Sequence, residues 1–459
     1  MAGALTDCLV APAIRLHKGE GLAEGLRCLR EFDPRVFLIF GGEAEDVQWL
    51  HETLEDQAGH PILFCADLER GAGEQFEGLT PLPDAYALNI LGAEACYDAG
   101  HRTAAEAAKA GVRWILAPVL DLHRSGRDAV NSPIVGHRAF HGDPKHVVEL
   151  AAAWLKGCAD AGGISCGKHF PGHGACPQDS HTEKAVAAED LGPHLEPFKA
   201  LLKQLPTIMA GHIHCPMLDD DDLPASRSAK VLSILRKQWG YKGLVVSDSL
   251  RMTGYGDGPH EQLAMESLHA GVDLLLDPED PVVLAISLRD ALQRGDLDAG
   301  RVEEAAARVH QLQRRAGDLP VAQPKPLMLG AGSKRLLKPL PGGSPGKHLP
   351  QPELALWLSG TRDTARFLED WGVQAMLSSA PPPAKLPEAV LVIWGASAGR
   401  GLPPLPHNWV EAITKQHTIL YVAGSPEAAE MVPKSAKGVY LPGISPALLA
   451  LLFAEEVEK

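Results

Sequence analysis

Short apolar runs alternate with amphipathic stretches through the first two-thirds of the chain, and this alternation constrains the fold more than any other feature. Continuous apolar runs are typical of strands buried on both faces, and helices between them indicate parallel βα units. Eight runs over roughly 250 to 300 residues predict a (β/α)₈ TIM-like barrel of the α/β class, although a doubly wound open sheet would give a similar pattern. The helical stretches include Arg102–Gly111 and Val147–Gly162, and the expected strands are Cys8–Ile14, Val36–Phe40, Ile62–Asp67, Ile115–Leu120, Ile164–Phe170, Thr207–Ile213, Leu244–Ser249 and Asp273–Asp277.

A proline-rich segment divides this region from a second, smaller α/β pattern. Eight prolines lie between Pro320 and Pro352, a composition that favours an extended linker over packed structure. We therefore expect a catalytic barrel over residues 1–318, a linker over 319–352 and a small α/β sandwich-type domain over 353–459. Its expected strands are Glu353–Gly360, Ala389–Gly395, Thr418–Gly424 and Gly438–Gly443, and its expected helices are His407–Gln416 and Pro446–Glu458.

Charge and cysteine usage exclude several classes of protein. The chain has 43 Lys and Arg against 58 Asp and Glu, a net charge of −15, so neither nucleic acid nor an anionic membrane is an expected partner. The apolar stretch Ala447–Ala454 is far too short to cross a bilayer. A secretory leader is not expected, because the first basic residue is Arg15 and no apolar run follows a basic start. The eight cysteines contain no CxxC pair, which favours reduced thiols in a cytoplasmic protein.

Charged and polar residues stand at the ends of several expected strands. In barrel enzymes the active site forms where the carboxyl ends of the strands meet. One such residue could have a structural role, but several that converge on one end of the barrel indicate an active site. The residues are Asp67, Lys168, His169, His212, His214 and Asp248.

The densest of these segments runs from Gly167 to His181 and ends in Asp179-Ser180-His181. Side chains two residues apart on an extended segment lie on the same side, so Asp179 can accept a hydrogen bond from the His181 imidazole. Such a carboxylate fixes the tautomer and raises the basicity of the ring, as a general acid/base requires.

The segment KHFPGHG followed by DSH resembles the barrel domain of family 3 glycoside hydrolases, in particular the bacterial β-N-acetylglucosaminidases. Four further segments are similar to that family in the same order, and the resemblance covers roughly residues 1 to 315. They are CADLE (Cys65–Glu69), APVLDL (Ala117–Leu122), IVGHRAF (Ile134–Phe140) and VVSDSLRM (Val246–Met252).

The resemblance implies a role for each matching residue. Asp248 corresponds to a nucleophile that forms a covalent glycosyl-enzyme, which water hydrolyses with retention. His181 corresponds to the acid/base and Asp179 to its partner. The terminal sugar is implied to contact Asp67, Arg138, Lys168 and His169.

The implied activity is that of a retaining exo-β-N-acetylglucosaminidase that needs no metal or organic cofactor and acts on a small carbohydrate. Muropeptide fragments and chitin oligosaccharides both remain open as substrates, as do a broad β-glucosidase and a phosphorylase of the same family. A catalytically inactive homologue that only binds sugar is disfavoured, because Asp248, His181 and Asp179 are retained together. Two departures stand out: Glu69-Arg70-Gly71 replaces the family's acid-Gly-Gly, and Ser249 follows the nucleophile where an acidic neighbour is commoner.

Other residues admit structural alternatives. His212 and His214, with His169 and His173, invite a zinc-dependent barrel hydrolase, but Lys168 beside His169 is unfavourable to a cation. For His212, the sequence does not favour a contact with the sugar over a position in the polar core near the barrel mouth, or the reverse. Asp121 is expected to cap loop amides in preference to contacting a ligand.

Overall fold

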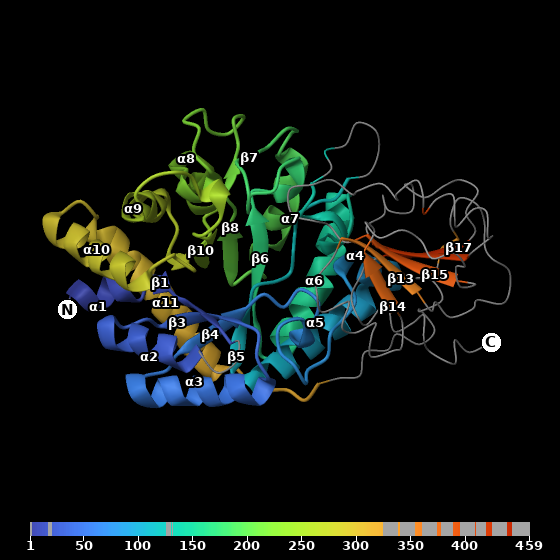
Figure 1. The fold of residues 1–459 in the computed structure, drawn as a ribbon. Coiled ribbons are helices and arrows are strands. Elements are labelled where there is room, and N and C mark those ends of the chain that lie inside the picture. The colour runs from blue at the N-terminus through green and yellow to red at the C-terminus, as the bar shows by residue number, and fades with distance from the viewer. Residues whose placement is uncertain are drawn as a thin grey trace.

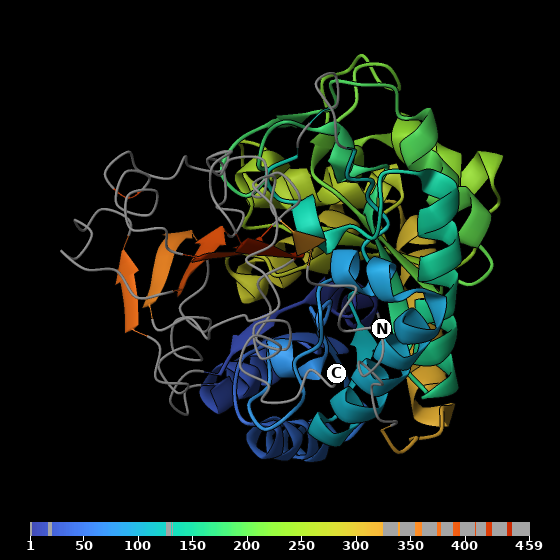
Figure 2. The same cartoon turned by 90° about the vertical axis from the view of Figure 1, so that its right-hand side faces the viewer.

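The computed structural model describes residues 2–16, 21–124, 130 and 132–324, followed by the segments 338–339, 354–359, 374–377, 389–394, 409, 419–424 and 438–442. Helices surround the strands of the first and larger part, as the two views in Figures 1 and 2 show.

The larger part is built on one parallel sheet, with the strand order β1-β11-β10-β8-β6-β5-β4-β3-β2. Its two end strands, β1 and β2, are separated only by Pro12, whose carbonyl accepts a hydrogen bond from the Leu38 amide at 2.9 Å. The sheet therefore closes on itself with eight strand positions, which confirms the predicted barrel over the open sheet. The strands are β1 (Val10–Ala11), β2 (Ala13–Arg15), β3 (Val36–Phe40), β4 (Leu63–Ala66), β5 (Val112–Ile115), β6 (Ile164–Phe170), β8 (Thr207–Ala210), β10 (Leu244–Ser249) and β11 (Leu274–Leu276).

The barrel strands pair in parallel and are buried along most of their length, with register shifts between β4 and β5, β6 and β8, and β10 and β11. Val36 lies opposite Leu63, Trp114 opposite Ile164 and Leu244 opposite Thr207. All seven residues of β6 are buried, although the strand carries a lysine and a histidine. One continuous apolar core joins the strands to the helices outside them.

Helices connect the strands, and several begin at a residue suited to capping. Asp143 accepts a hydrogen bond from the Lys145 amide and is followed by Pro144, and Asp280 caps α10 in the same way. The helices are α1 (Ala2–Asp7), α2 (Gly21–Glu31), α3 (Ala44–Ala58), α4 (Ala85–Leu91), α5 (Ala93–Ala107), α6 (Pro144–Asp160), α7 (Gly192–Leu201), α8 (Ala229–Ser233), α9 (His260–Ala270), α10 (Pro281–Arg294) and α11 (Ala299–Asp318).

Helices α5 and α6 approach each other through two glycines. A Cβ atom on Gly100 would lie 2.1 Å from the Trp154 carbonyl oxygen, and one on Gly157 would lie 2.0 Å from the Tyr97 carbonyl oxygen. Backbone atoms cannot move aside as a flexible side chain can. The crossing therefore requires glycine at both positions.

Two of the expected barrel strands are displaced in the structure. The strand expected over Ile115–Leu120 is β5, which ends at Ile115, so that boundary was wrong. Pro118 has no amide hydrogen for the ladder, and the segment beyond β5 pairs with β6 irregularly. It does so through the bridge between Val119 and Lys168 and through a bond from the Cys166 amide to the Ala117 carbonyl at 2.8 Å. The sixth strand ends at Ala210, and Ile213–His214 forms β9, which pairs with β7 (Ala185–Val186) in a separate two-stranded sheet.

A second sheet of six strands follows, with the order β12-β17-β16-β15-β13-β14. It is parallel except for β12, which pairs antiparallel with β17 although it lies inside the expected linker. The four strands expected here are confirmed, and β14 was missed. The expected helices over 407–416 and 446–458 lie outside the described residues, apart from Trp409. The strands are β12 (Lys338–Pro339), β13 (Leu354–Ser359), β14 (Gln374–Leu377), β15 (Ala389–Trp394), β16 (Ile419–Gly424) and β17 (Gly438–Pro442).

No helix in the described parts of the chain has the length and apolar character needed to cross a membrane. All eight cysteines are buried free thiols.

Candidate active site

The polar residues predicted at strand ends gather at the carboxyl ends of the barrel strands. Asp67 directly follows β4, Lys168 and His169 lie near the end of β6, and Asp248 lies near the end of β10. Because all barrel strands run parallel, these residues belong to one mouth of the barrel.

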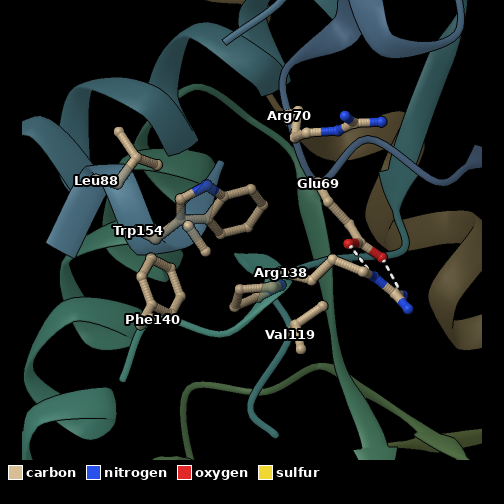
Figure 3. Close-up of a pocket in the computed structure, with 9 residues that line it drawn as sticks. Glu69, Arg70, Leu88, Val119, Arg138, Phe140 and Trp154 are labelled. Carbon is tan, nitrogen blue, oxygen red and sulfur yellow. Dashed lines mark hydrogen bonds and ion pairs between the residues drawn. The ribbon is translucent and has the colours of Figure 1, made fainter. Parts of the chain in front are cut away.

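Glu69 joins three of the predicted substrate-binding residues into one ionic network. Lys168 Nζ lies 2.7 Å from Asp67 Oδ1 and 2.6 Å from Glu69 Oε1. Arg138 donates from Nε and Nη2 to the two oxygens of Glu69, at 2.8 and 2.7 Å (Figure 3). From the sequence, Glu69 was expected only as part of an altered loop. Its position just beyond the end of a predicted strand, two residues after Asp67, was a signal that both carboxylates lie at the same mouth of the barrel.

Glu69, Arg138 and Lys168 stay charged at neutral pH. Burial would raise the pKa of Glu69, but Arg138 and Lys168 outweigh it and hold that pKa well below its usual range. Burial would lower the pKa of Lys168, but Asp67 and Glu69 raise it above its usual value. Two carboxylates and two cations thus form a preorganised polar wall.

Arg70, the residue that departs from the family's glycine, is held away from this network. Its Nε donates to Glu74 Oε1 at 3.0 Å and its Nη1 lies 3.8 Å from Asp84 Oδ1. Figure 3 shows its guanidinium extending away from the Glu69–Arg138 pair. A cavity of about 10 Å³ beside Arg138 has room for one water at most.

Asp121 organises the segment that follows β6. Its carboxylate accepts hydrogen bonds from the amides of His169 and His173, at 3.2 and 2.6 Å, which confirms its expected capping role. It also lies 2.6 Å from His169 Nδ1. Since an ionised carboxylate only accepts hydrogen bonds, Nδ1 carries a proton and the imidazole is fixed in orientation.

Asp179 and His181 form the predicted pair. His181 Nδ1 donates to Asp179 Oδ1 at 2.7 Å; the side chain of Asp179 is fully buried, whereas that of His181 is 53% exposed. This hydrogen bond raises the pKa of His181, although burial opposes the shift. The Nε2 edge of His181 is therefore presented to solvent as a proton donor and acceptor.

Backbone hydrogen bonds attach the loop of this pair to the loop that follows β10. Gly254 N donates to Ser180 O at 2.8 Å, and Thr253 N donates to His181 O at 3.2 Å. A Cβ on Gly254 would lie 2.9 Å from Ser180 O, so the two loops are in close contact. A further hydrogen bond of 2.7 Å joins Ser180 Oγ to His173 Nε2. The pair is thereby held beside the strand end that carries Asp248.

Asp248 is ionised at neutral pH. Burial would raise its pKa, but His169, His212 and His181 outweigh burial and lower the pKa to about 2. The Ser249 amide also donates to Asp248 Oδ1 at 2.8 Å. The Ser249 hydroxyl donates instead to Asp277 at 2.9 Å, so it does not compete for the Asp248 carboxylate.

His212 is a polar core residue and not an open sugar contact. Its Nε2 donates to the Ser249 carbonyl at 3.0 Å, and its Nδ1 accepts from Ser226 Oγ at 2.7 Å. Burial lowers its pKa to about 4, so the ring is neutral at neutral pH. Both ring nitrogens are thus occupied.

The histidines considered for zinc do not assemble into a group of ligands in the described residues. The group there with metal-ligand spacing is Asp219, Asp220 and Asp221, and it contains none of them. Lys230 Nζ lies 3.0, 2.5 and 2.9 Å from these three carboxylates. A lysine ammonium therefore already contacts all three carboxylates.

Comparison with known sequences identifies relatives of the barrel. The model of the family described as "Glycosyl hydrolase family 3 N terminal domain" matches residues 43–312. A beta-hexosaminidase of Alkalilimnicola ehrlichii is 36% identical over 264 residues, which is 53% of this chain and 73% of that protein. A beta-hexosaminidase of Bordetella avium is 37% identical over 243 residues, 50% of this chain and 67% of that protein.

Solved structures extend the likeness to nearly the whole chain. A family 3 β-N-acetylglucosaminidase from Paenibacillus superimposes with a TM-score of 0.79 at 22% identity, covering 99% of this chain and 96% of that one. A β-glucoside phosphorylase, BglX, gives a TM-score of 0.80 at 20% identity, covering 99% and 91%. At these identities the two likenesses establish the fold.

Proposed function

The chain belongs to glycosyl hydrolase family 3 and is a glycoside hydrolase, and on that premise we propose that it is a retaining, exo-acting β-N-acetylglucosaminidase. Its substrate would be a small carbohydrate that ends in a non-reducing β-linked N-acetylglucosamine. The beta-hexosaminidase name shared by the relatives from Alkalilimnicola ehrlichii and Bordetella avium supports this choice.

One observation carries the proposal: the loop bearing an exposed imidazole is bonded to the loop that follows an ionised aspartate. The backbone bonds from Gly254 and Thr253 hold His181 there, and Asp248 has a depressed pKa. A retaining glycosidase needs these two functions at one site, an anionic nucleophile and a proton donor.

The proposed reaction has two steps. In the first, His181 Nε2–H protonates the leaving oxygen while Asp248 attacks the anomeric carbon, which gives a covalent glycosyl-aspartate. In the second, the now neutral His181 takes a proton from water, which displaces Asp248 with net retention. Asp179 keeps the ring oriented and stabilises its protonated form in both steps.

The network around Glu69 is proposed to bind the terminal sugar. Asp67 and Lys168 are suited to ring hydroxyls, and Arg138 and His169 to the hydroxyls or the acetamido group. Because Glu69 and Asp121 hold these side chains in place, little conformational entropy is lost when sugar binds. Glu69 is a positioning residue in this account.

A comparison of two chromogenic substrates tests the proposal. We expect an aryl β-N-acetylglucosaminide to be cleaved far faster than the matching β-glucoside, and Asp248→Ala to lose at least about a thousandfold in turnover of the former. Equal rates would favour a broad β-glucosidase. An Asp248→Ala variant that keeps a tenth of the activity would remove Asp248 from the nucleophile's role.

Phosphate is a second possible acceptor, because a histidine acid/base does not repel an anion as a carboxylate does. The exposed edge of His181 is the observation that favours it. When phosphate is added to the assay, phosphorolysis gives N-acetylglucosamine 1-phosphate. Hydrolysis gives free N-acetylglucosamine under the same conditions.

We also propose the expected boundaries, with the barrel over 1–318, the linker over 319–352 and the small domain over 353–459. The separate six-stranded sheet supports the last of these. The eight free thiols support a reducing, cytoplasmic location.

A further inference from the structure

A cavity of about 470 Å³ lies at the opposite end of the barrel from the candidate active site. It is bounded by the segment before β8, the segment before β10 and one face of α11, at the amino ends of these strands. Its size is within the range of about 300–1,000 Å³ typical of small-molecule sites. Leu244 lines this cavity at the start of β10, whereas Asp248 lies near the end of the same strand.

The charge of the lining is unusual for so acidic a chain. Four cations line the cavity and no carboxylate does, although the whole chain carries a net charge of −15. Arg308 is paired with Asp273 at 2.8 Å and with Glu304 at 2.6 Å. Lys203, Lys242 and Arg315 are exposed, and they form no ion pair within the described parts of the chain.

These three unpaired cations come from three different segments. Lys203 precedes β8, Lys242 precedes β10, and Arg315 lies two turns after Arg308 on α11. Exposed cations that flank one cavity from separate segments, with no carboxylate partner, are free to bind an anion. A phosphate group carries about −1.5 to −2 charge near neutral pH, so one or two phosphates match three cations better than a single carboxylate does.

The rest of the lining is apolar or aromatic. Trp239 is half-buried, and its ring meets that of Phe170 in a T-shaped contact with 6.0 Å between centroids. Tyr241 is 4% exposed and its hydroxyl donates to Leu205 O at 3.0 Å, which ties the two loops together. An indole held in place at the wall of a cavity offers a surface for a flat ring.

We propose that this cavity binds a small phosphate-bearing molecule with a flat ring, at a site separate from the catalytic mouth. Lys203, Lys242 and Arg315 contact its phosphates, and its ring lies against Trp239. The ligand joins α11 to the loops before β8 and β10, so its binding stabilises the barrel.

Calorimetric titration of the full chain tests this proposal, with ATP as the probe and adenosine as its uncharged counterpart. We expect saturable ATP binding at one site, weakened when NaCl is raised from about 50 to 200 mM, and no binding of adenosine. The double variant Lys242→Gln/Arg315→Gln should weaken ATP binding at least tenfold. The matched double variant Lys109→Gln/Lys145→Gln, which removes two exposed lysines elsewhere, should leave it unchanged.

Three results would overturn the proposal. They are the absence of saturable ATP binding, equal effects of the two double variants, and an ATP affinity that the Lys242→Gln/Arg315→Gln variant leaves intact. The last result would place the bound ATP elsewhere, for example at the barrel mouth. None of them bears on glycoside cleavage, which is measured separately.

Discussion

Replacing Glu69 with glutamine tests whether the ionic network at the barrel mouth is one structural unit. The Glu69 side chain is 13% exposed and that of Lys168 is 2% exposed. Glu69→Gln removes the anion between Arg138 and Lys168 but keeps the size of the side chain. Arg138 then loses a two-point ion pair, while Lys168 keeps Asp67 at 2.7 Å. Removing one partner of a buried pair costs about 3–5 kcal/mol, and because Lys168 keeps one partner we expect about 3 kcal/mol.

Urea unfolding of the full chain measures this loss, and Glu74→Gln is the matched control on the same loop. Burial raises the pKa of Glu74 although Arg70 opposes it, so a neutral amide replaces this carboxyl group at a smaller cost of about 1 kcal/mol. We also expect Glu69→Gln to raise KM about tenfold with a smaller change in kcat, because sugar-binding side chains lose their orientation. Glu74→Gln should leave KM unchanged.

The pH dependence of the loss gives a second check. The folded-state pKa of Glu69 is depressed, so its stabilisation is complete above the unfolded pKa near 4.5 and is lost as pH falls toward the folded value. The stability difference between wild type and Glu69→Gln should therefore shrink below about pH 4.5, by at most about 1.4 kcal/mol per pH unit. A loss below about 1 kcal/mol at pH 7, as for an exposed ion pair, would refute the reasoning.

Two further predictions concern the helix crossing and the acid/base. Gly157→Ala should destabilise the protein by about 1–3 kcal/mol in the same unfolding assay, because its Cβ would lie 2.0 Å from the Tyr97 carbonyl oxygen. A stability equal to wild type would show that the helices can separate at no cost. Asp179→Asn should move the alkaline limb of the kcat/KM profile to lower pH, because Asp179 raises the pKa of His181, which must be protonated to act as an acid. An alkaline limb that stays in place would assign it to another group.

The barrel could be predicted from the sequence because its strands are continuous apolar runs. The segment Ile164–Phe170 matches β6 at both ends, and Leu244–Ser249 matches β10. The expected strand at Ile115–Leu120 was misplaced because an apolar run continues past the end of β5, and hydropathy alone does not show where regular strand pairing gives way to isolated hydrogen bonds.

The pairing of Asp179 with His181 was also predictable, because the two residues are close in sequence. The partners of Glu69 were not. Arg138 is 69 residues away and Lys168 is further still, and only the barrel topology brings them to Glu69. The same holds for the bonds from Gly254 and Thr253 to the dyad loop, which depend on the backbone course of two loops.

His181 is the proposed acid/base that works with Asp248, and the most direct test of this role compares His181→Ala on two substrates. A natural disaccharide with a poor leaving group needs protonation, whereas an activated aryl β-N-acetylglucosaminide does not. General acid catalysis contributes about 10²–10⁴-fold, so His181→Ala should lose at least about a hundredfold on the disaccharide and less than about tenfold on the aryl glycoside. Asp248→Ala, the control, should abolish turnover of both. Equal losses on the two substrates in His181→Ala would contradict the account and place the acid elsewhere.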